Sequence, residues 1–469
     1  MLSLDGRRFD MAGGIWTSQN KVLPGVYINT QSKNSVISNI GTRGTVAIPM
    51  SLSWGESGKV QEINAGDDLT PFIGYDITAD QALFLREMFK GSDVTGAPTK
   101  VLLYRLAGTS GAKATVTIGE DETTLTATAK YNGTRGNDIS IAVVADPDDV
   151  GAYDVSTIVS GSVVDIQHVS AITGLKANDW IDFTGTTALV ASTGASLTGG
   201  VNPTVSSTDY SSFLTAIEPY TFDIVCYDGA DSTVKAAFVQ FITRINEAVG
   251  KKCQLVLAGA VGVADSKYVI AVKNGVKLAD GTTLTAAQAT YWVAGVEAGA
   301  LYNQSLTYAK YPDAVEANPK LSNADIETNV KGGMIVFIDD FGDVKICTDI
   351  NTKTTVTVKE GAEFKKNRVM RVLMQFCNDV YEYFSKHYIG KVDNNDNGRS
   401  LLRKYIIGYL NEMQANNGIQ NFVAEDVEVL PGTAVDAVII NANIAPVDSI
   451  EKIYVTVNVT ANGATITAA

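Results

Sequence analysis

The sequence lacks the features that would direct a chain into or across a membrane. No run approaches the roughly 20 consecutive apolar residues of a spanning helix, and the first residues show no basic segment followed by an apolar core and a cleavage site. We therefore expect no membrane insertion, and synthesis in the cytoplasm without export. Charged residues are also sparse, at 19% against 45% hydrophobic residues, a balance typical of folded globular domains.

Cysteine and histidine are too few and too scattered to form a recognisable reactive or metal-binding motif. The four cysteines stand far apart, without a CxxC or zinc-knuckle spacing. Neither His168 nor His387 lies in the sequence setting of a serine or cysteine nucleophile. We expect reduced core thiols, no metal ligands and no cofactor. The cysteines are Cys226, Cys253, Cys347 and Cys377.

Basic residues are outnumbered, with 37 Lys and Arg against 51 Asp and Glu, so the net charge is −14. Phosphate binding requires clustered Lys and Arg, and this balance argues against nucleic acid as a partner. One segment runs against the trend, because residues 361–410 hold nine Lys or Arg and five Asp or Glu. The segment is therefore +4, which leaves −18 for the remainder. A charged interface and a solvated helix face are equally consistent with it.

Three stretches resemble catalytic or ligand-binding motifs and then depart from them. Residues 55–59, GESGK, end like a phosphate-binding loop, but the first glycine and the magnesium-binding hydroxyl are missing. Residues 393–398 match the start of an EF-hand, but Lys404 stands where the loop needs a bidentate Glu. The DFG of residues 340–342 has no kinase catalytic loop to accompany it. We interpret all three as turns and expect a protein that is not an enzyme, with no catalytic residues.

Most of the chain alternates between helical and strand patterns. We predict a discontinuous α/β middle domain over residues 25–107 and 204–330. Within it, residues 222–227, 232–249 and 254–258 read as strand, helix and strand, a βαβ unit whose strands are parallel.

Two further helices are predicted in this middle domain. One covers residues 79–90, with Thr78 as N-cap and Gln81 three residues later as the second member of a capping box. The other covers residues 286–302 and is apolar nearly all round, which predicts burial. The remaining strands are expected at residues 26–30, 45–48 and 101–106.

Residues 108–203 differ in composition and interrupt the α/β pattern. They are rich in Thr, Ser, Gly, Val and Asp, with short alternating runs broken by turn residues. This pattern predicts an inserted all-β domain on the outside of the scaffold, where insertions are tolerated.

A C-terminal α+β domain is expected over residues 331–449. Two long amphipathic helices, around residues 369–380 and 402–413, have apolar residues at spacings of three and four. A polar loop, residues 391–398, separates them. Strands are expected at residues 334–339, 344–349, 354–358, 427–430 and 437–441, the first two as a hairpin.

Each end of the chain carries a strand with no obvious partner close by in sequence. An N-terminal arm, residues 1–24, leads into a Pro-anchored run at 24–29. The C-terminal tail, residues 450–469, begins with a clean alternation over 450–459. Terminal strands either close a sheet in their own subunit or add to the exposed edge of a neighbour's sheet.

A set of short motifs, in order along the chain, resembles the tail sheath proteins of contractile phage tails. The chain looks close to the branch found in Gram-positive prophages and phage-tail-like bacteriocins. The matches span both ends and the α/β body, while the β insert diverges. They are MAGG (11–14), QNK (19–21), PGVYIN (24–29), RGTVA (43–47), WG (54–55), DINT (349–352), KNRV (366–369), YIGKV (388–392), NGR (397–399) and EKIY (451–454).

This resemblance implies a structural subunit of a virion tail or tail-like particle, assembled in the bacterial cytoplasm. The subunit would stack in hexameric rings into a helical sheath around an inner tail tube protein, with baseplate and tail terminator proteins as further partners. Contraction from a metastable extended state would drive the tube through a bacterial envelope. Residues 331–449 would form the inner domain and residues 108–203 the outer one. A sheath-like subunit of another contractile injection system is the alternative.

The resemblance also implies that the terminal strands link neighbouring subunits. Separately, the charge count leads to the hypothesis that a basic surface faces the inner tube or an acidic neighbour. The expected linking residues are Pro24, Gly25, Val26, Tyr27, Ile28, Ile453, Tyr454, Val455, Val457 and Val459, and the expected basic surface is Lys365, Lys366, Arg368 and Arg371.

Overall fold

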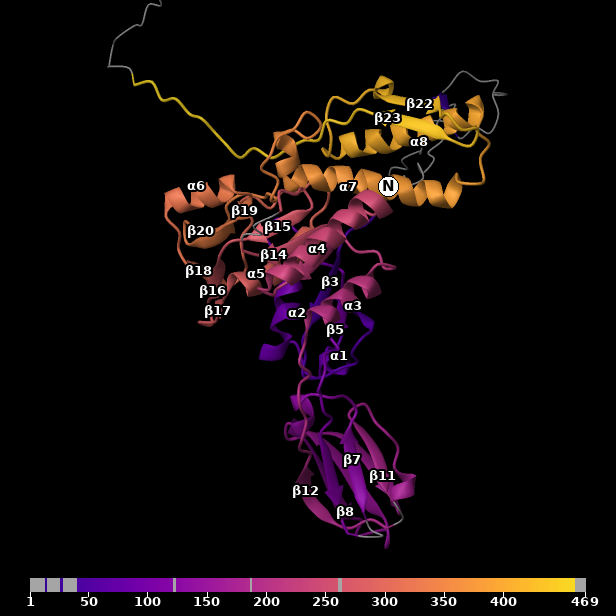
Figure 1. Ribbon diagram of the computed structural model, residues 1–469, viewed down its shortest axis with the longest axis vertical. Helices are drawn as coiled ribbons and strands as arrows, with labels where there is room; N and C mark the ends of the chain where they lie inside the picture. Colours follow the sequence, from indigo (N-terminus) through magenta and orange to yellow (C-terminus); the bar gives the residue numbers. More distant parts are fainter. Residues whose placement is uncertain are drawn as a thin grey trace, which may run out of the picture. The chain divides into compact units, whose positions relative to one another are not determined.

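The structure is a computed structural model that describes residues 13–14, 26–27, 40–120, 124–185, 188–259 and 264–459. The chain divides into two compact units, Met1–Asn39 and Ile40–Ala469. In the first, β1 (Gly13–Gly14) pairs in parallel with β2 (Val26–Tyr27). The second unit contains all the other elements (Figure 1).

A seven-stranded sheet forms the centre of the second unit, and six of its strands are parallel. Only the edge strand β4 is antiparallel to its neighbour. Successive side chains point to opposite faces, and both faces are buried. In sheet order the strands are β19 (Met334–Ile335), β15 (Val269–Val272), β14 (Gln254–Ala258), β13 (Ile224–Tyr227), β3 (Thr45–Met50), β5 (Lys100–Arg105) and β4 (Val60–Asn64).

Helices cover both faces of this sheet (Figure 1). On one face lie α2 (Leu83–Met88) and α5 (Ala286–Gly299), and on the other α3 (Ser207–Ile217) and α4 (Ser232–Arg244). The predicted βαβ unit is confirmed, since Ile224 in β13 pairs in parallel with Gln254 in β14. The buried helix predicted from residue 286 is also confirmed as α5.

The predicted capping box at residue 78 is wrong. Thr78 donates its hydroxyl hydrogen to Asp76, 2.5 Å away, and the helix begins later as a 3-10 turn at Asp80. Arg86 donates to three carbonyls of this entry, those of Ile77, Thr78 and Ala79. These carbonyls are acceptors, so Arg86 fixes the turn before the helix but does not replace the predicted cap, which would have accepted from backbone N–H groups.

The inserted segment is all-β, as predicted, and forms a sandwich of two antiparallel sheets (Figure 1). Trp54, from the middle domain, enters its core and packs on Trp180 with ring centroids 4.9 Å apart. One sheet has the order β10 (Ser162–Val169), β9 (Tyr153–Val159), β8 (Ile139–Ala145), β12 (Ser192–Ser196), and the other β11 (Ile181–Gly185), β7 (Leu125–Ala129), β6 (Thr115–Ile118).

The C-terminal part centres on the two predicted long helices, α7 (Asn367–His387) and α8 (Asp396–Ala415). A two-stranded sheet, β22 (Val427–Pro431) and β23 (Val438–Ala442), packs its inner face against them. The fold-class prediction is therefore confirmed: mixed helices and sheets, a β-sandwich domain and a C-terminal α+β domain.

Two strand predictions near the start of this part are corrected. The expected hairpin is split, because β19 joins the central sheet beside β15 and only β20 (Phe337–Asp340) pairs with β21 (Asp343–Ile346). Residues 354–358 form no strand, and Asp265 instead accepts hydrogen bonds from their backbone. The remaining α-helices and strands are α1 (Thr70–Ile73), α6 (Asn323–Lys331), β16 (Gly275–Leu278), β17 (Thr283–Leu284) and β18 (Ala314–Asn318).

Candidate subunit-linking site

The C-terminal tail leaves the domain as an exposed extended segment. Residues 451–459 form no strand with any other described residue. The side chains on both faces of the segment are exposed, so neither face packs against another described part of this subunit. The exposed fractions are 78% for Ile453, 91% for Tyr454, 77% for Val455, 78% for Val457 and 92% for Val459.

The tail is anchored at its base. Glu451 accepts a hydrogen bond of 2.8 Å from the Thr307 hydroxyl and forms an ion pair with Lys366. Asp448 lies 3.8 Å from the same Lys366 ammonium. The start of the segment is thus fixed while its apolar residues extend away from the domain.

The N-terminal linking residues are only partly described. Pro24, Gly25 and Ile28 lie outside the described residues, whereas Val26 and Tyr27 form β2 and pair with Gly13 and Gly14.

The β22–β23 sheet offers edges at which a strand could add. It has only these two strands among the described residues, and a two-stranded sheet is marginally stable without further cover. Its inner face contacts α8, while Leu430 and Ile439 are 39% and 47% exposed.

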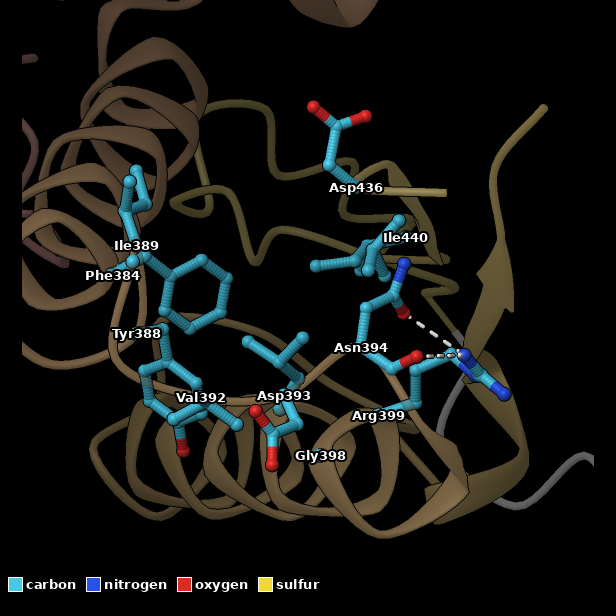
Figure 2. Close-up of a pocket in the computed structure, with 13 residues that line it drawn as sticks. Phe384, Tyr388, Ile389, Val392, Asp393, Asn394, Gly398, Arg399, Asp436 and Ile440 are labelled. Carbon is cyan, nitrogen blue, oxygen red and sulfur yellow. Dashed lines mark hydrogen bonds between the residues drawn. The ribbon is translucent and has the colours of Figure 1, made fainter. Parts of the chain in front are cut away.

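A pocket of about 300 Å³ lies beside β23. Figure 2 shows Phe384, Tyr388 and Ile389 on one side and Arg399 with Asn394 on the other. Arg399 donates to the side-chain oxygen of Asn394 at 2.9 Å. The apolar lining from β23 is Val438 and Ile440.

The loop that borders this pocket is the stretch that resembled an EF-hand. Asn395 is the N-cap of α8, and its side-chain oxygen accepts from the Gly398 backbone at 2.9 Å. A Cβ on Gly398 would lie 2.0 Å from the Asp393 carbonyl oxygen, so the turn requires glycine. The segment joins two helices, as predicted.

The predicted basic surface is corrected at Arg371. This side chain is fully buried, where it donates a hydrogen bond to Glu297 of α5 and forms an ion pair with Asp349 at 2.6 Å. It cannot face a tube or a neighbour. The count of charges gave a wrong prediction here, because an arginine on an amphipathic helix is expected to be exposed unless its buried partner is known.

The other three basic residues also form hydrogen bonds or ion pairs within the chain. The Lys365 ammonium donates to the carbonyls of Val330 and Lys331, and burial lowers its pKa. Lys366 is held by Glu451. Arg368 is half-buried, and burial lowers its pKa. Of the four predicted residues, Lys366 is the one that contacts the tail, and Arg371 is fully buried.

A buried polar cluster around Arg371 joins the middle and C-terminal parts. Asn367 donates to Glu297 at 3.1 Å and to Asp349 at 2.9 Å. Burial, and then the Asp349 carboxylate, raises the pKa of Glu297 to about 8. Burial opposes the ionised form of Asp349 too, but Arg371 and the Leu306 N–H outweigh it and lower the pKa of Asp349.

The cluster was not predicted from the sequence, although the position of Glu297 gave one indication of it. Glu297 is the single acidic residue in the otherwise apolar stretch 286–302, and a buried acid requires a partner. The partner itself could not be identified, since Arg371 lies 74 residues away.

The expectation of core thiols holds for Cys226 and Cys253, whereas Cys347 and Cys377 are only partly buried. None forms a disulfide, Cys226 and Cys253 are fully buried, and burial raises the pKa of both thiols. A raised pKa makes a thiol a poor nucleophile.

Among the described residues, none of the helices combines the length and apolar composition needed to cross a membrane.

Family models match most of the chain. They are the tail sheath protein Gp18 domain III N-terminal region at residues 43–106, the phage tail sheath protein beta-sandwich domain at 108–202, the phage tail sheath protein central domain at 204–352 and the phage tail sheath C-terminal domain at 359–460. The chain is also 34% identical to the phage-like element PBSX protein XkdK of Bacillus subtilis (strain 168), over 96% of this chain and all of that protein.

Solved structures give the same result. A sheath tail protein from Desulfitobacterium hafniense is 44% identical, with a TM-score of 0.82 over 92% of this chain and 99% of that one. The helical sheath of the anti-feeding prophage in its contracted state shares the fold at 12% identity, with a TM-score of 0.55 over 93% of this chain and 99% of that one. The chain therefore belongs to the phage tail sheath protein family.

Proposed function

We propose that the chain polymerises helically around an inner tail tube and contracts from a metastable extended state to drive that tube through a bacterial envelope. The observation that carries the proposal is the tail segment 451–459, which is extended, unpaired within the described chain and lined with exposed apolar side chains. The family is structural rather than enzymatic, so assembly is the activity to be explained.

The exposed tail can supply enough free energy to link subunits. Burying an aliphatic side chain of this size contributes about 1.5–3 kcal/mol, and each main-chain hydrogen bond adds about 0.5–1.5 kcal/mol. Ile453, Val455 and Val457 all lie on one face of an extended segment. Strand addition therefore offers several kcal/mol that the isolated subunit leaves unused.

The acceptor we propose is the β22–β23 sheet of another subunit. A strand added along β23 would lie about 4.8 Å from it, over the pocket lined by Val438 and Ile440 of β23 and by Phe384 of α7. Inward side chains of the incoming strand would enter that pocket. The N-terminal arm, residues 1–24 with the strand that follows, is proposed as the second link.

Such a contact is head-to-tail, and a head-to-tail contact that does not close generates a helix. Hydrogen bonds between strands can persist while the domains they connect rotate as rigid bodies, which suits contraction without nucleotide hydrolysis. We propose hexameric rings, an inner position for residues 331–449 and an outer one for residues 108–203. The partners would be the inner tail tube, baseplate and tail terminator proteins.

The particle would be a virion tail or a phage-tail-like bacteriocin, assembled in the bacterial cytoplasm. A second candidate is the sheath of another contractile injection system. It is favoured by the fold shared with the anti-feeding prophage sheath over 93% of this chain.

Paired substitutions on the two faces of the tail test the link. Val455→Asp with Val457→Asp places charge on the face that would be buried, and Thr456→Asp with Asn458→Asp places the same charge on the opposite face. We expect the first variant to remain a folded, soluble subunit that forms no cylinders in electron micrographs. The second variant should form cylinders like the unmodified chain.

Truncation before Ile450 should also abolish cylinders without unfolding the subunit. Normal cylinders from the Val455 and Val457 variant would overturn the linking role of the tail. Failure of both charge variants alike would show that net charge, and not the buried face, controls assembly.

A further inference from the structure

Three side chains that could bind a metal ion lie close together at one end of the four-stranded sheet of the sandwich. His168 is in β10, Asp154 is opposite it in β9, and Asp146 follows the last residue of β8. The imidazole Nδ1 lies 2.9 Å from Asp154 Oδ1 and 3.4 Å from Asp146 Oδ2. One ligand atom from each of the three residues lies within 4.8 Å of the others.

The surrounding contacts orient these groups before any ligand binds. Asp146 Oδ1 accepts from the backbone N–H of Asp148 at 2.7 Å and of Asp149 at 3.3 Å, which leaves Oδ2 to face the imidazole. Asp154 is paired on both sides, to Val144 and His168, so its backbone position is fixed by the sheet. Asp149 Oδ2 lies 3.4 Å from the other ring nitrogen, Nε2.

The charge of this cluster is not balanced by Lys or Arg. Asp146, Asp148, Asp149 and Asp154 lie close together in sequence or across the sheet. The ion pairs of the described residues give His168 as the cationic partner of three of them and no Lys or Arg within 4 Å. The site therefore favours a cation, which is either the ring proton or a metal.

We propose that Asp146, Asp154 and His168 bind a divalent transition-metal ion of the Zn²⁺ class. One imidazole nitrogen with two carboxylate oxygens is a ligand set that such ions accept, and three protein ligands leave a position for water. The metal would replace the proton on Nδ1, and Nε2–H would then donate to Asp149. A carboxylate on the second ring nitrogen of a metal-bound histidine is the usual means of fixing its tautomer.

The site is separate from the proposed linking surface and does not depend on it. Its ligands come from β9, from β10 and from the residue after β8, so a bound ion would join the ends of three neighbouring strands. The charged groups that face the ring are Asp146, Asp149 and Asp154.

Calorimetric titration of the chelator-treated full chain with Zn²⁺ tests the site. We expect one saturable, equimolar event, weakened roughly tenfold or more in His168→Gln and in Asp154→Asn. Asp148→Asn is the matched control, because it removes the same charge as Asp154→Asn from the neighbouring loop without removing a ligand, and it should bind like the unmodified chain. A second readout, the Zn²⁺-dependent rise in unfolding temperature, should be lost in the same two variants.

Two results would overturn the proposal. One is the absence of saturable binding in the unmodified chain, which would leave His168 as a protonated partner of the carboxylates. The other is equal weakening in all three variants, which would show diffuse attraction of the ion to acidic surface. Circular dichroism of each variant would separate lost binding from lost folding.

Discussion

Glu297 is a residue whose protonation should be visible in the stability of the whole subunit. It is fully buried between Arg371 and Asp349, and its pKa is raised from 4.5 to about 8. Between those two values the unfolded chain releases the proton while the folded chain keeps it. Stability should therefore fall as the pH rises from about 4.5 to about 8, with a limiting slope near 1.4 kcal/mol per pH unit.

Glu297→Gln mimics the protonated form and should remove this contribution. We expect the unfolding temperature of the variant to depend less on pH between about 5 and about 8 than that of the unmodified chain. Glu382→Gln serves as the control, because Glu382 pairs with Lys386 on the exposed surface. Parallel pH profiles for Glu297→Gln and the unmodified chain would show that Glu297 is ionised in the folded state.

Single residues were the least predictable part of this protein. Burial of the stretch 286–302 followed from its composition, yet the hydrogen bond between Arg371 and Glu297 depends on two helices meeting in space. Arg371 was assigned to a surface because charge can be counted in a sequence, whereas burial of a charge cannot. The tail residues differ, because their alternation alone predicts a strand that requires a partner.

At the scale of elements, Trp54 explains how the β-sandwich is attached to the middle domain. It comes from the loop after β3, is 1% exposed, and packs in the sandwich core against Trp180 and Tyr131. Arg105 at the end of β5 adds hydrogen bonds to the carbonyls of Leu52 at 3.1 Å and Asn132 at 2.7 Å. The connection is therefore packed and not only a pair of linkers.

Trp54→Ala should loosen this attachment. Removing a buried tryptophan costs about 3–5 kcal/mol, and the loss would fall on the sandwich and its junction. We expect faster limited proteolysis between residues 107 and 113, with the central sheet still protected. Phe341→Ala is the control, since Phe341 is fully exposed at a hairpin tip and its removal should change nothing. Unchanged cleavage in Trp54→Ala would assign the attachment to Arg105 instead.

Elements were predicted well where a local pattern dominates and poorly where distant groups compete. The strand and helix order 222–258 follows from continuous apolar runs, and the structure has it. The strand expected at 354–358 is absent because Asp265, 89 residues from Thr354, binds that backbone. Strand β4 was missed, since its burial comes from pairing along β5 and not from its own pattern.

At the scale of the whole molecule, the sandwich should be dispensable for assembly. Its two connections run side by side, because Thr109 pairs with Thr204 and Ala112 with Val201. A short Gly-Ser linker can therefore replace residues 109–203 without separating the ends that it joins. The tail and the β22–β23 sheet both lie in the retained part.

We expect the shortened chain, with Trp54→Ser to avoid an exposed aromatic ring, to fold and to form cylinders of reduced outer diameter in electron micrographs. The reason is that the proposed links come from the termini, while the position proposed for the sandwich is on the outside. The same deletion combined with Val455→Asp and Val457→Asp is the control and should give no cylinders. A shortened chain that is folded by circular dichroism yet never polymerises would place essential contacts in the sandwich, and the outer position proposed for it would have to be abandoned.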